Sequence, residues 1–178
     1  CPNCLAEHQM ASKDHEIWCT ACHKRWQMTT LGQLQSLDGQ TEFSHIPDWY
    51  EFEREHVKKE ILSGEYYFED EVIVDALPNA KGYIRLGKGR LIHDYEGFHL
   101  SGFFDGVDFK LDKEPLSLYS LHVEYNYFKK GDCLDLSTLN DTFYIYPQTR
   151  QNVVTKLHFA TEEMYKLAKL NKLPQVKK

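Results

Sequence analysis

Long apolar runs, export signals and internal repeats are all missing from this 178-residue sequence. No apolar stretch approaches the roughly 18 to 20 residues that a membrane-spanning helix needs, and no basic segment followed by an apolar one marks a secretory signal. No Met precedes Cys1, so we expect the chain to be a piece of a longer protein. Together these absences predict a soluble protein that is located in the cytoplasm.

Recognisable catalytic motifs are absent as well. The sequence has no Gly-x-Ser-x-Gly elbow, Walker loop, His-Glu-x-x-His motif or glycine-rich dinucleotide turn. His45 with Asp48, and His93 with Asp94, could act as acid–base pairs, but a helix cap and a turn explain them more simply. The stretch "LGKG" at 86–89 is too short to cradle a phosphate and indicates a hairpin turn. A hydrolase with an unrecognised site stays an alternative.

Basic residues are scarce in the first part of the chain. Residues 1–70 contain six Lys and Arg against thirteen Asp and Glu, whereas residues 71–178 contain fifteen against fourteen. An acidic front half repels a phosphate backbone, so we expect no nucleic-acid partner.

Four of the five cysteines form two Cys-x-x-Cys pairs, which fourteen residues separate. Cys1, Cys4, Cys19 and Cys22 offer the four thiolates of a tetrahedral zinc site, and the spacer is long enough for a hairpin that returns the second pair to the first. Since four thiolates close the shell, this zinc would be structural and not catalytic. The nearby His8, His15 and His23 are then surface residues.

Three other interpretations of the cysteines remain open. Iron also accepts four thiolates. A redox centre needs a Cys-x-x-Cys at a helix N-terminus beside a βαβ unit, which the sequence does not indicate. A disulfide clip needs an oxidising compartment, against which the absent signal and the unpaired Cys133 argue. We expect Cys133 to be a buried free thiol.

The pattern of apolar residues predicts an α+β protein in three parts. Residues 1–42 form a zinc ribbon, with strands around Ile17 and Trp26 and a last strand in 31–40. Residues 43–64 form a linking helix, with Pro47 in its first turn and an apolar face of Ile46, Tyr50, Val57 and Ile61, with Trp49 beside it.

Residues 65–178 are predicted to form a β-rich domain. Turn signals divide it into an antiparallel meander, and a helix near 152–170 follows. That helix has an apolar stripe of Val153, Leu157, Ala160, Met164 and Leu167. This arrangement resembles the half-open barrel of pleckstrin-homology or GRAM domains. The predicted strands are Val72–Leu77, Tyr83–Leu86, Arg90–His93, Phe98–Phe103, Val107–Leu111, Tyr119–Phe128, Cys133–Ser137 and Thr142–Tyr146.

Tyrosines are concentrated in residues 121–147. Tyr125, Tyr127, Tyr144 and Tyr146 could line a ligand groove. They also alternate as strand residues do, so a packed sheet face explains them without a ligand.

Three segments together carry a family resemblance. The Cys4 ribbon, "TEFSHIPDWYEFERE" at 41–55 and "GDCLDLSTLNDTFYIYP" at 131–147 resemble the C-terminal extension of a group of bacterial 1-acyl-glycerol-3-phosphate acyltransferases. In that family a catalytic domain comes first and a ribbon of the pattern CPxC…WCxxC follows. Its catalytic signature is a His followed, after four residues, by an Asp. None of the nine histidines here has an Asp at that position, so no catalytic residue is carried over.

The resemblance implies a non-catalytic accessory region of a phospholipid-synthesis enzyme. Its partner would be an upstream acyltransferase domain of the same polypeptide, at the inner face of the membrane. The alternative is a free-standing binding module for a lipid headgroup or a protein. The basic closing segment, with Lys166, Lys169, Lys172, Lys177 and Lys178, predicts weak attraction to an anionic membrane surface, although it also suits the C-terminal end of a helix.

Overall fold

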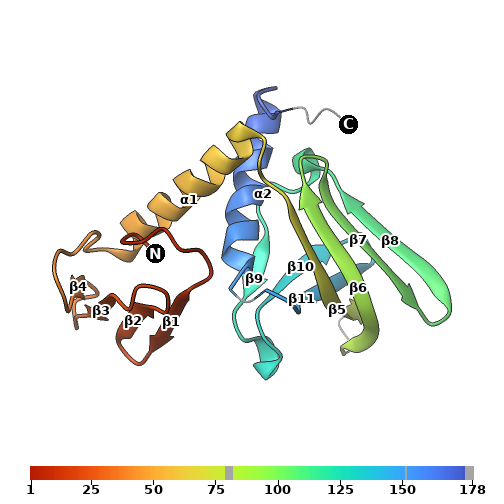
Figure 1. The fold of residues 1–178 in the computed structure, drawn as a ribbon. Helices are drawn as coiled ribbons and strands as arrows, with labels where there is room; N and C mark the ends of the chain where they lie inside the picture. Colours follow the sequence, from red (N-terminus) through yellow and green to blue (C-terminus); the bar gives the residue numbers. More distant parts are fainter. Residues whose placement is uncertain (79–81, 151, 175–178) are drawn as a thin grey trace. The chain divides into compact units, whose positions relative to one another are not determined.

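A computed structural model describes residues 1–78, 82–150 and 152–174 of the chain (Figure 1). The chain divides into two compact units, Cys1–His56 and Val57–Lys178, and the boundary falls inside helix α1 (Ile46–Ser63). A four-stranded sheet belongs to the first unit and a seven-stranded sheet to the second. The predicted α+β class is confirmed, with its N-terminal cysteine cluster, antiparallel sheet and C-terminal helix.

The first unit is a meander of four short strands, each antiparallel to the next. The hairpin of the first two strands fills the spacer between the cysteine pairs, as predicted. Its two-residue turn places Asp14 at φ +55°, a left-handed conformation that Asp tolerates better than most residues. The strands are β1 (Met10–Lys13), β2 (Glu16–Cys19), β3 (Arg25–Met28) and β4 (Leu34–Ser36).

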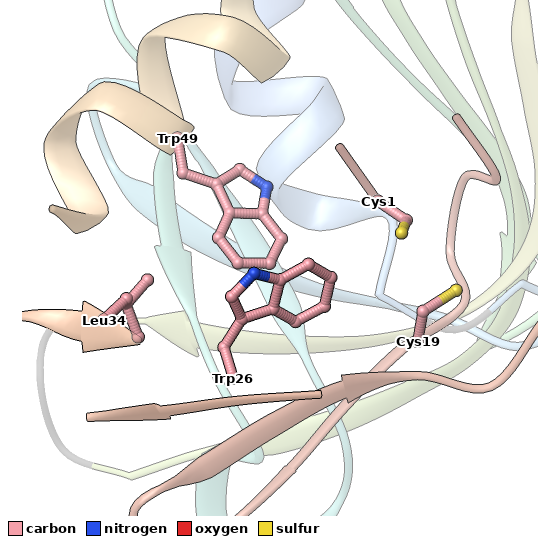
Figure 2. Close-up of a cluster of buried hydrophobic side chains, with 5 residues drawn as sticks. All are labelled: Cys1, Cys19, Trp26, Leu34 and Trp49. Carbon is pink, nitrogen blue, oxygen red and sulfur yellow. The ribbon is translucent and has the colours of Figure 1, made fainter. Parts of the chain in front are cut away.

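Two tryptophans form the centre of the first unit's core. Trp26 of β3 and Trp49 of α1 are buried, with ring centroids 5.0 Å apart at an angle of 60° (Figure 2). Leu34 completes one side of this cluster. The predicted helix is confirmed. Val57 and Ile61 of its predicted apolar face are buried, whereas Ile46 is 39% exposed and Trp49 is the buried residue of the first turn.

The second unit contains seven strands in the order β8-β7-β6-β5-β11-β10-β9, all antiparallel. Strand β5 is central and pairs with β6 on one side and β11 on the other. The sheet is open and does not close into a barrel. The strands are β5 (Phe68–Pro78), β6 (Ile84–Asp94), β7 (Gly97–Phe104), β8 (Val107–Lys113), β9 (His122–Glu124), β10 (Cys133–Ser137) and β11 (Asp141–Pro147).

The expected hairpin turn at 86–89 is wrong, because these residues lie inside β6. Gly87 takes a φ of +135° where the pairing of β5 with β6 shifts register between Val74 and Asp75, so the glycine makes a bulge and not a turn. Gly89 continues the strand where a Cβ atom would lie 2.7 Å from the Ser101 carbonyl oxygen. Both glycines therefore serve close strand packing.

The predicted strand Tyr119–Phe128 is also wrong over most of its length. Only β9 is extended, and short 3-10 helices occupy Pro115–Ser117 and Tyr127–Lys129. Asn126 and Phe128 both have a φ of +48°, a left-handed conformation that ends strand pairing. Asn adopts this conformation more often than most residues, whereas Phe128 carries no sequence signal for it.

Helix α2 (Val154–Lys169) confirms the predicted C-terminal helix and its apolar stripe, all five residues of which are buried. The helix lies along β9, where His158 Nδ1 donates a hydrogen bond of 2.7 Å to the Leu121 carbonyl oxygen (Figure 1). In the described ranges, no helix combines the length and apolar character that crossing a bilayer requires.

His93 is a buried histidine of the second unit's core, and not one of an acid–base pair. Its ring stacks on Phe98 at 3.8 Å, and its Nδ1 lies 2.9 Å from the Tyr66 hydroxyl. Burial, with a smaller contribution from His99, lowers the pKa of His93 to about 3. Asp94 accepts the Glu96 amide at 2.8 Å, which confirms the turn that was predicted there.

The buried His93 predicts a loss of stability in acid. In the unfolded chain its pKa is about 6.5, so below that pH the unfolded state binds a proton that the native state does not, and the free energy of unfolding falls by up to about 1.4 kcal/mol per pH unit. We expect His93→Phe to be destabilised at pH 7 through the lost Tyr66 contact, yet to show a correspondingly shallower slope between pH 6.5 and 4.5. Urea unfolding across that range measures both quantities. The exposed His15→Gln serves as control, and equal slopes for wild type and His93→Phe would contradict the assignment.

Candidate metal centre

The two cysteine pairs lie in turns of the same backbone shape. In the first turn, the Leu5 amide donates to the Cys1 carbonyl oxygen at 2.9 Å. In the second, the His23 amide donates to the Cys19 carbonyl oxygen, also at 2.9 Å. Leu5 and His23 have φ of +61° and +62°, a conformation that costs non-glycine residues on the order of 1 kcal/mol or more. Two turns with the same strained conformation indicate the same role: each turn directs its two cysteine sulfurs towards one common point.

The four sulfurs meet at that point. All four Sγ atoms lie within 4.8 Å of one another, and the Cys1–Cys22 and Cys4–Cys19 pairs are each 3.7 Å apart. Sulfurs placed about 2.3 Å from a central ion at tetrahedral corners are about 3.8 Å apart, which matches these separations. A disulfide needs about 2.05 Å, and all five cysteines of the chain are free thiols. The geometry fits a tetrahedral metal site and does not fit a disulfide clip.

Backbone amides supply hydrogen bonds to the second sulfur of each pair. The Asn3 side chain, at 3.5 Å, and the Lys24 amide lower the pKa of Cys22 to about 7. The Ala6 amide likewise favours the thiolate of Cys4, but desolvation and the neighbouring thiols leave the pKa of Cys4 raised. Crowded thiols of this kind resist losing a second proton unless a cation is present to balance the charge.

The metal centre and the tryptophan core are continuous. The buried Cys1 and Cys19 belong to the same apolar cluster as Trp26 and Trp49 (Figure 2). Burial on this side shields the two sulfurs from water, whereas Cys4 is exposed. A metal at this position therefore connects the N-terminal turn to the core of the sheet.

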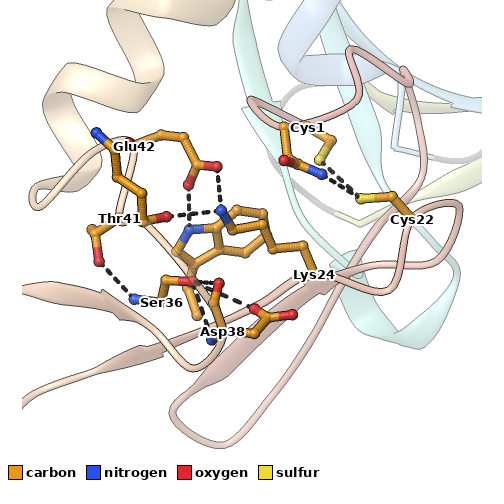
Figure 3. Close-up of polar contacts among 10 residues, drawn as sticks. Cys1, Cys22, Lys24, Ser36, Asp38, Thr41 and Glu42 are labelled. Atoms are coloured by element: carbon orange, nitrogen blue, oxygen red, sulfur yellow. Dashed lines mark hydrogen bonds and ion pairs between the residues drawn. The ribbon is translucent and has the colours of Figure 1, made fainter.

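A partly buried ion pair supports the second cysteine turn. Lys24 donates to Glu42 at 2.5 Å and to the Gln40 carbonyl at 2.8 Å (Figure 3). The other Glu42 oxygen accepts the Trp26 indole N–H at 3.0 Å. Although burial raises the pKa of Glu42, these two donors hold it below its usual value. Glu42 thus satisfies the polar edge of the core tryptophan and anchors the residue that follows the turn.

The other candidate residues do not gather at this centre. Of the three nearby histidines, His15 and His23 are exposed and His8 is half-buried, and none belongs to the ligand cluster. Cys133 is fully buried on β10, as predicted, and burial raises the pKa of its thiol to about 12, so it is a poor nucleophile.

Two further histidines, one in each unit, are at least partly exposed. His45 and Asp48 are exposed at the start of α1. His99 of the second unit has its Nδ1 2.7 Å from Asp112 and its Nε2 3.6 Å from Asp94. Both ring nitrogens face carboxylates, so neither presents a free lone pair to a substrate.

The tyrosines of residues 121–147 differ in their exposure to solvent. Tyr146 is buried on β11, whereas Tyr125 is 59% exposed. Tyr127 stacks on Tyr144 at 5.5 Å and its hydroxyl lies 2.6 Å from that of Tyr83. The expected alternation along one sheet face is confirmed for β11 only. Tyr83 also belongs to this cluster, although it is distant in the sequence, and no sequence pattern indicated that it would.

Comparison with known proteins identifies no relative, because no family model, no curated protein and no solved structure matches the chain.

The cluster predicts about one metal ion per chain, bound through all four cysteines. Cys4→Ser and Cys22→Ser should each lower the metal content of the purified protein severely, because three thiolates leave the shell open. Cys133→Ser and His23→Gly are matched controls: the first removes a distant thiol, and the second replaces a strained residue of the turn by one that adopts its φ freely. Elemental analysis together with native thiol titration measures the outcome. A metal content that falls in either control, or persists in Cys22→Ser, would contradict the ligand set.

Proposed function

We propose that this chain is a non-catalytic accessory region in which a structural zinc ion organises the first unit and the second unit acts as a binding domain. The convergence of four sulfurs within 4.8 Å carries the proposal. Four thiolates complete the coordination of zinc and leave no position for water or substrate, so the ion stabilises a fold. Zinc is preferred to iron here because a small, non-redox structural site is its most common use with four thiolates.

The parent protein that we propose is a bacterial 1-acyl-glycerol-3-phosphate acyltransferase. The resemblance of the ribbon and of residues 41–55 and 131–147 supports this proposal. The partner of the chain is then an acyltransferase domain upstream in the same polypeptide, which transfers an acyl chain to lysophosphatidate at the inner face of the cytoplasmic membrane. The basic closing segment would add a weak attraction to anionic lipid, although Lys166 is already paired with Glu163 at 2.6 Å, and Lys177 and Lys178 lie outside the described residues.

A structural role for the metal predicts that its removal unfolds the first unit selectively. All three tryptophans, Trp18, Trp26 and Trp49, belong to that unit, so their fluorescence reports on it alone. A strong chelator should shift the tryptophan emission towards longer wavelength. The near-ultraviolet circular dichroism of the tyrosines in the second unit should persist. Restored zinc should reverse the shift. Unchanged tryptophan emission in protein that has demonstrably lost its metal would refute the structural role.

The absence of a carried-over catalytic residue predicts that the chain alone does not acylate lysophosphatidate. With acyl-CoA or acyl carrier protein as donor, we expect product formation no faster than in buffer. His99→Gln and His45→Gln serve to identify any activity as the chain's own. A turnover that survives repurification and disappears in either variant would show that the chain is itself an enzyme.

A further inference from the structure

The second unit has an open apolar pocket of about 310 Å³ at one end of its sheet. Strand pairing brings the wall together, since Ala76 of β5 lies opposite Ile84 of β6 and Phe143 of β11. The volume is at the lower end of small-molecule sites, which span about 300 to 1,000 Å³. A heavy atom with its hydrogens takes up about as much space as a water, roughly 30 Å³, so the pocket accepts on the order of ten heavy atoms.

Three phenylalanines hold the pocket in a fixed shape. The ring of Phe104 lies across Gly102, where a Cβ atom would be 2.4 Å from it, so only glycine permits this ring position. Phe109 lies 5.4 Å from Phe104 and 5.0 Å from Phe143, measured between ring centroids. The wall is therefore preformed, and a ligand does not have to order it.

The mouth of the pocket exposes apolar side chains to water. Ile84 and Val107, which line it, are 53% and 65% exposed, and the neighbouring Phe103 is 65% exposed. Each of these three residues lies close to a hairpin turn, and both turns are at the same end of the sheet. Burial of this apolar surface by a ligand is favourable, and exposed apolar groups around a pocket mark binding sites.

The charge at the mouth selects between ligands. Asp108 and Asp141 line the pocket, and no Lys or Arg within the described ranges forms an ion pair with either carboxylate. Asp105 adds a third negative charge at the adjoining turn. The free carboxylate of a fatty acid or a phosphate group is repelled there, whereas a cation is attracted.

We propose that this pocket binds a single-chain amphiphile with a cationic head. The apolar chain lies among Phe104, Phe109 and Phe143, and the ammonium group lies at the mouth beside Asp108 and Asp141. This ligand class goes beyond the proposed accessory function, and the site is independent of the metal centre.

Isothermal titration of the intact chain with short amphiphiles below their micelle concentrations tests the proposal. We expect decyltrimethylammonium to bind once per chain and decanoate to bind at least tenfold more weakly. The double variant Asp108→Asn/Asp141→Asn should weaken binding of the cation by roughly tenfold, because it removes both attractive charges that line the pocket. Asp14→Asn removes one similar charge from the first unit and should leave binding unchanged.

A second variant tests the apolar half of the site. Val107→Gln changes a side chain that is mostly exposed, so the fold should survive with an unchanged melting temperature, but binding of both amphiphiles should weaken. Three outcomes would overturn the proposal: no saturable binding of decyltrimethylammonium, equal affinities for the two head groups, or an effect of Asp108→Asn/Asp141→Asn no larger than that of Asp14→Asn.

Discussion

The convergence of four cysteine sulfurs is the constraint on which the first unit depends. A unit that ends at His56 is close to the size below which an apolar core alone rarely suffices. Besides two of the cysteines, the buried members of its core cluster are Trp26, Trp49 and Leu34, and the other apolar side chains packed against them are only partly buried. The strained Leu5 and His23 persist only if something holds both turns in place. A metal ion bound by the four cysteines would do so, because it would join the N-terminal turn to the strands and, through the tryptophans, to helix α1.

The second unit is stabilised differently. Apolar side chains of its long central strand are buried, and buried polar groups find hydrogen-bond partners within the unit. Asp70 of β5 is buried, yet its carboxylate accepts the Thr149 amide at 3.1 Å, the Thr149 hydroxyl at 2.5 Å and the Arg150 amide at 3.2 Å. These bonds fix the chain where it leaves β11 and approaches α2. Tyr95 acts similarly at the other helix, since its hydroxyl donates to the Ile61 carbonyl oxygen at 3.0 Å. Paired strands and satisfied polar groups therefore hold this unit together, and its open pocket can be supported by a rigid sheet.

Sequence reasoning succeeded where a local pattern determines a local structure. The Cys-x-x-Cys spacing indicated the cluster, and the steps of three and four in α2 indicated a buried stripe. It failed where a residue's role depends on a distant neighbour. Gly87 and Gly89 looked like turn residues because the opposing strand that requires them is invisible in the sequence, and Phe104 gave no sign that it would lie across Gly102. The pocket and the tyrosine cluster around Tyr83 exist only after the strands pair, so no motif could announce them.

X-ray absorption at the metal edge of the purified protein tests the central claim most directly, because it identifies the element and counts its ligands in one measurement. The account predicts zinc with four sulfur neighbours at about 2.3 Å and no nitrogen or oxygen in the inner shell. A spectrum that requires a nitrogen or oxygen ligand would show an open or histidine-containing site. Such a result would contradict both the closed shell and the structural role that follows from it.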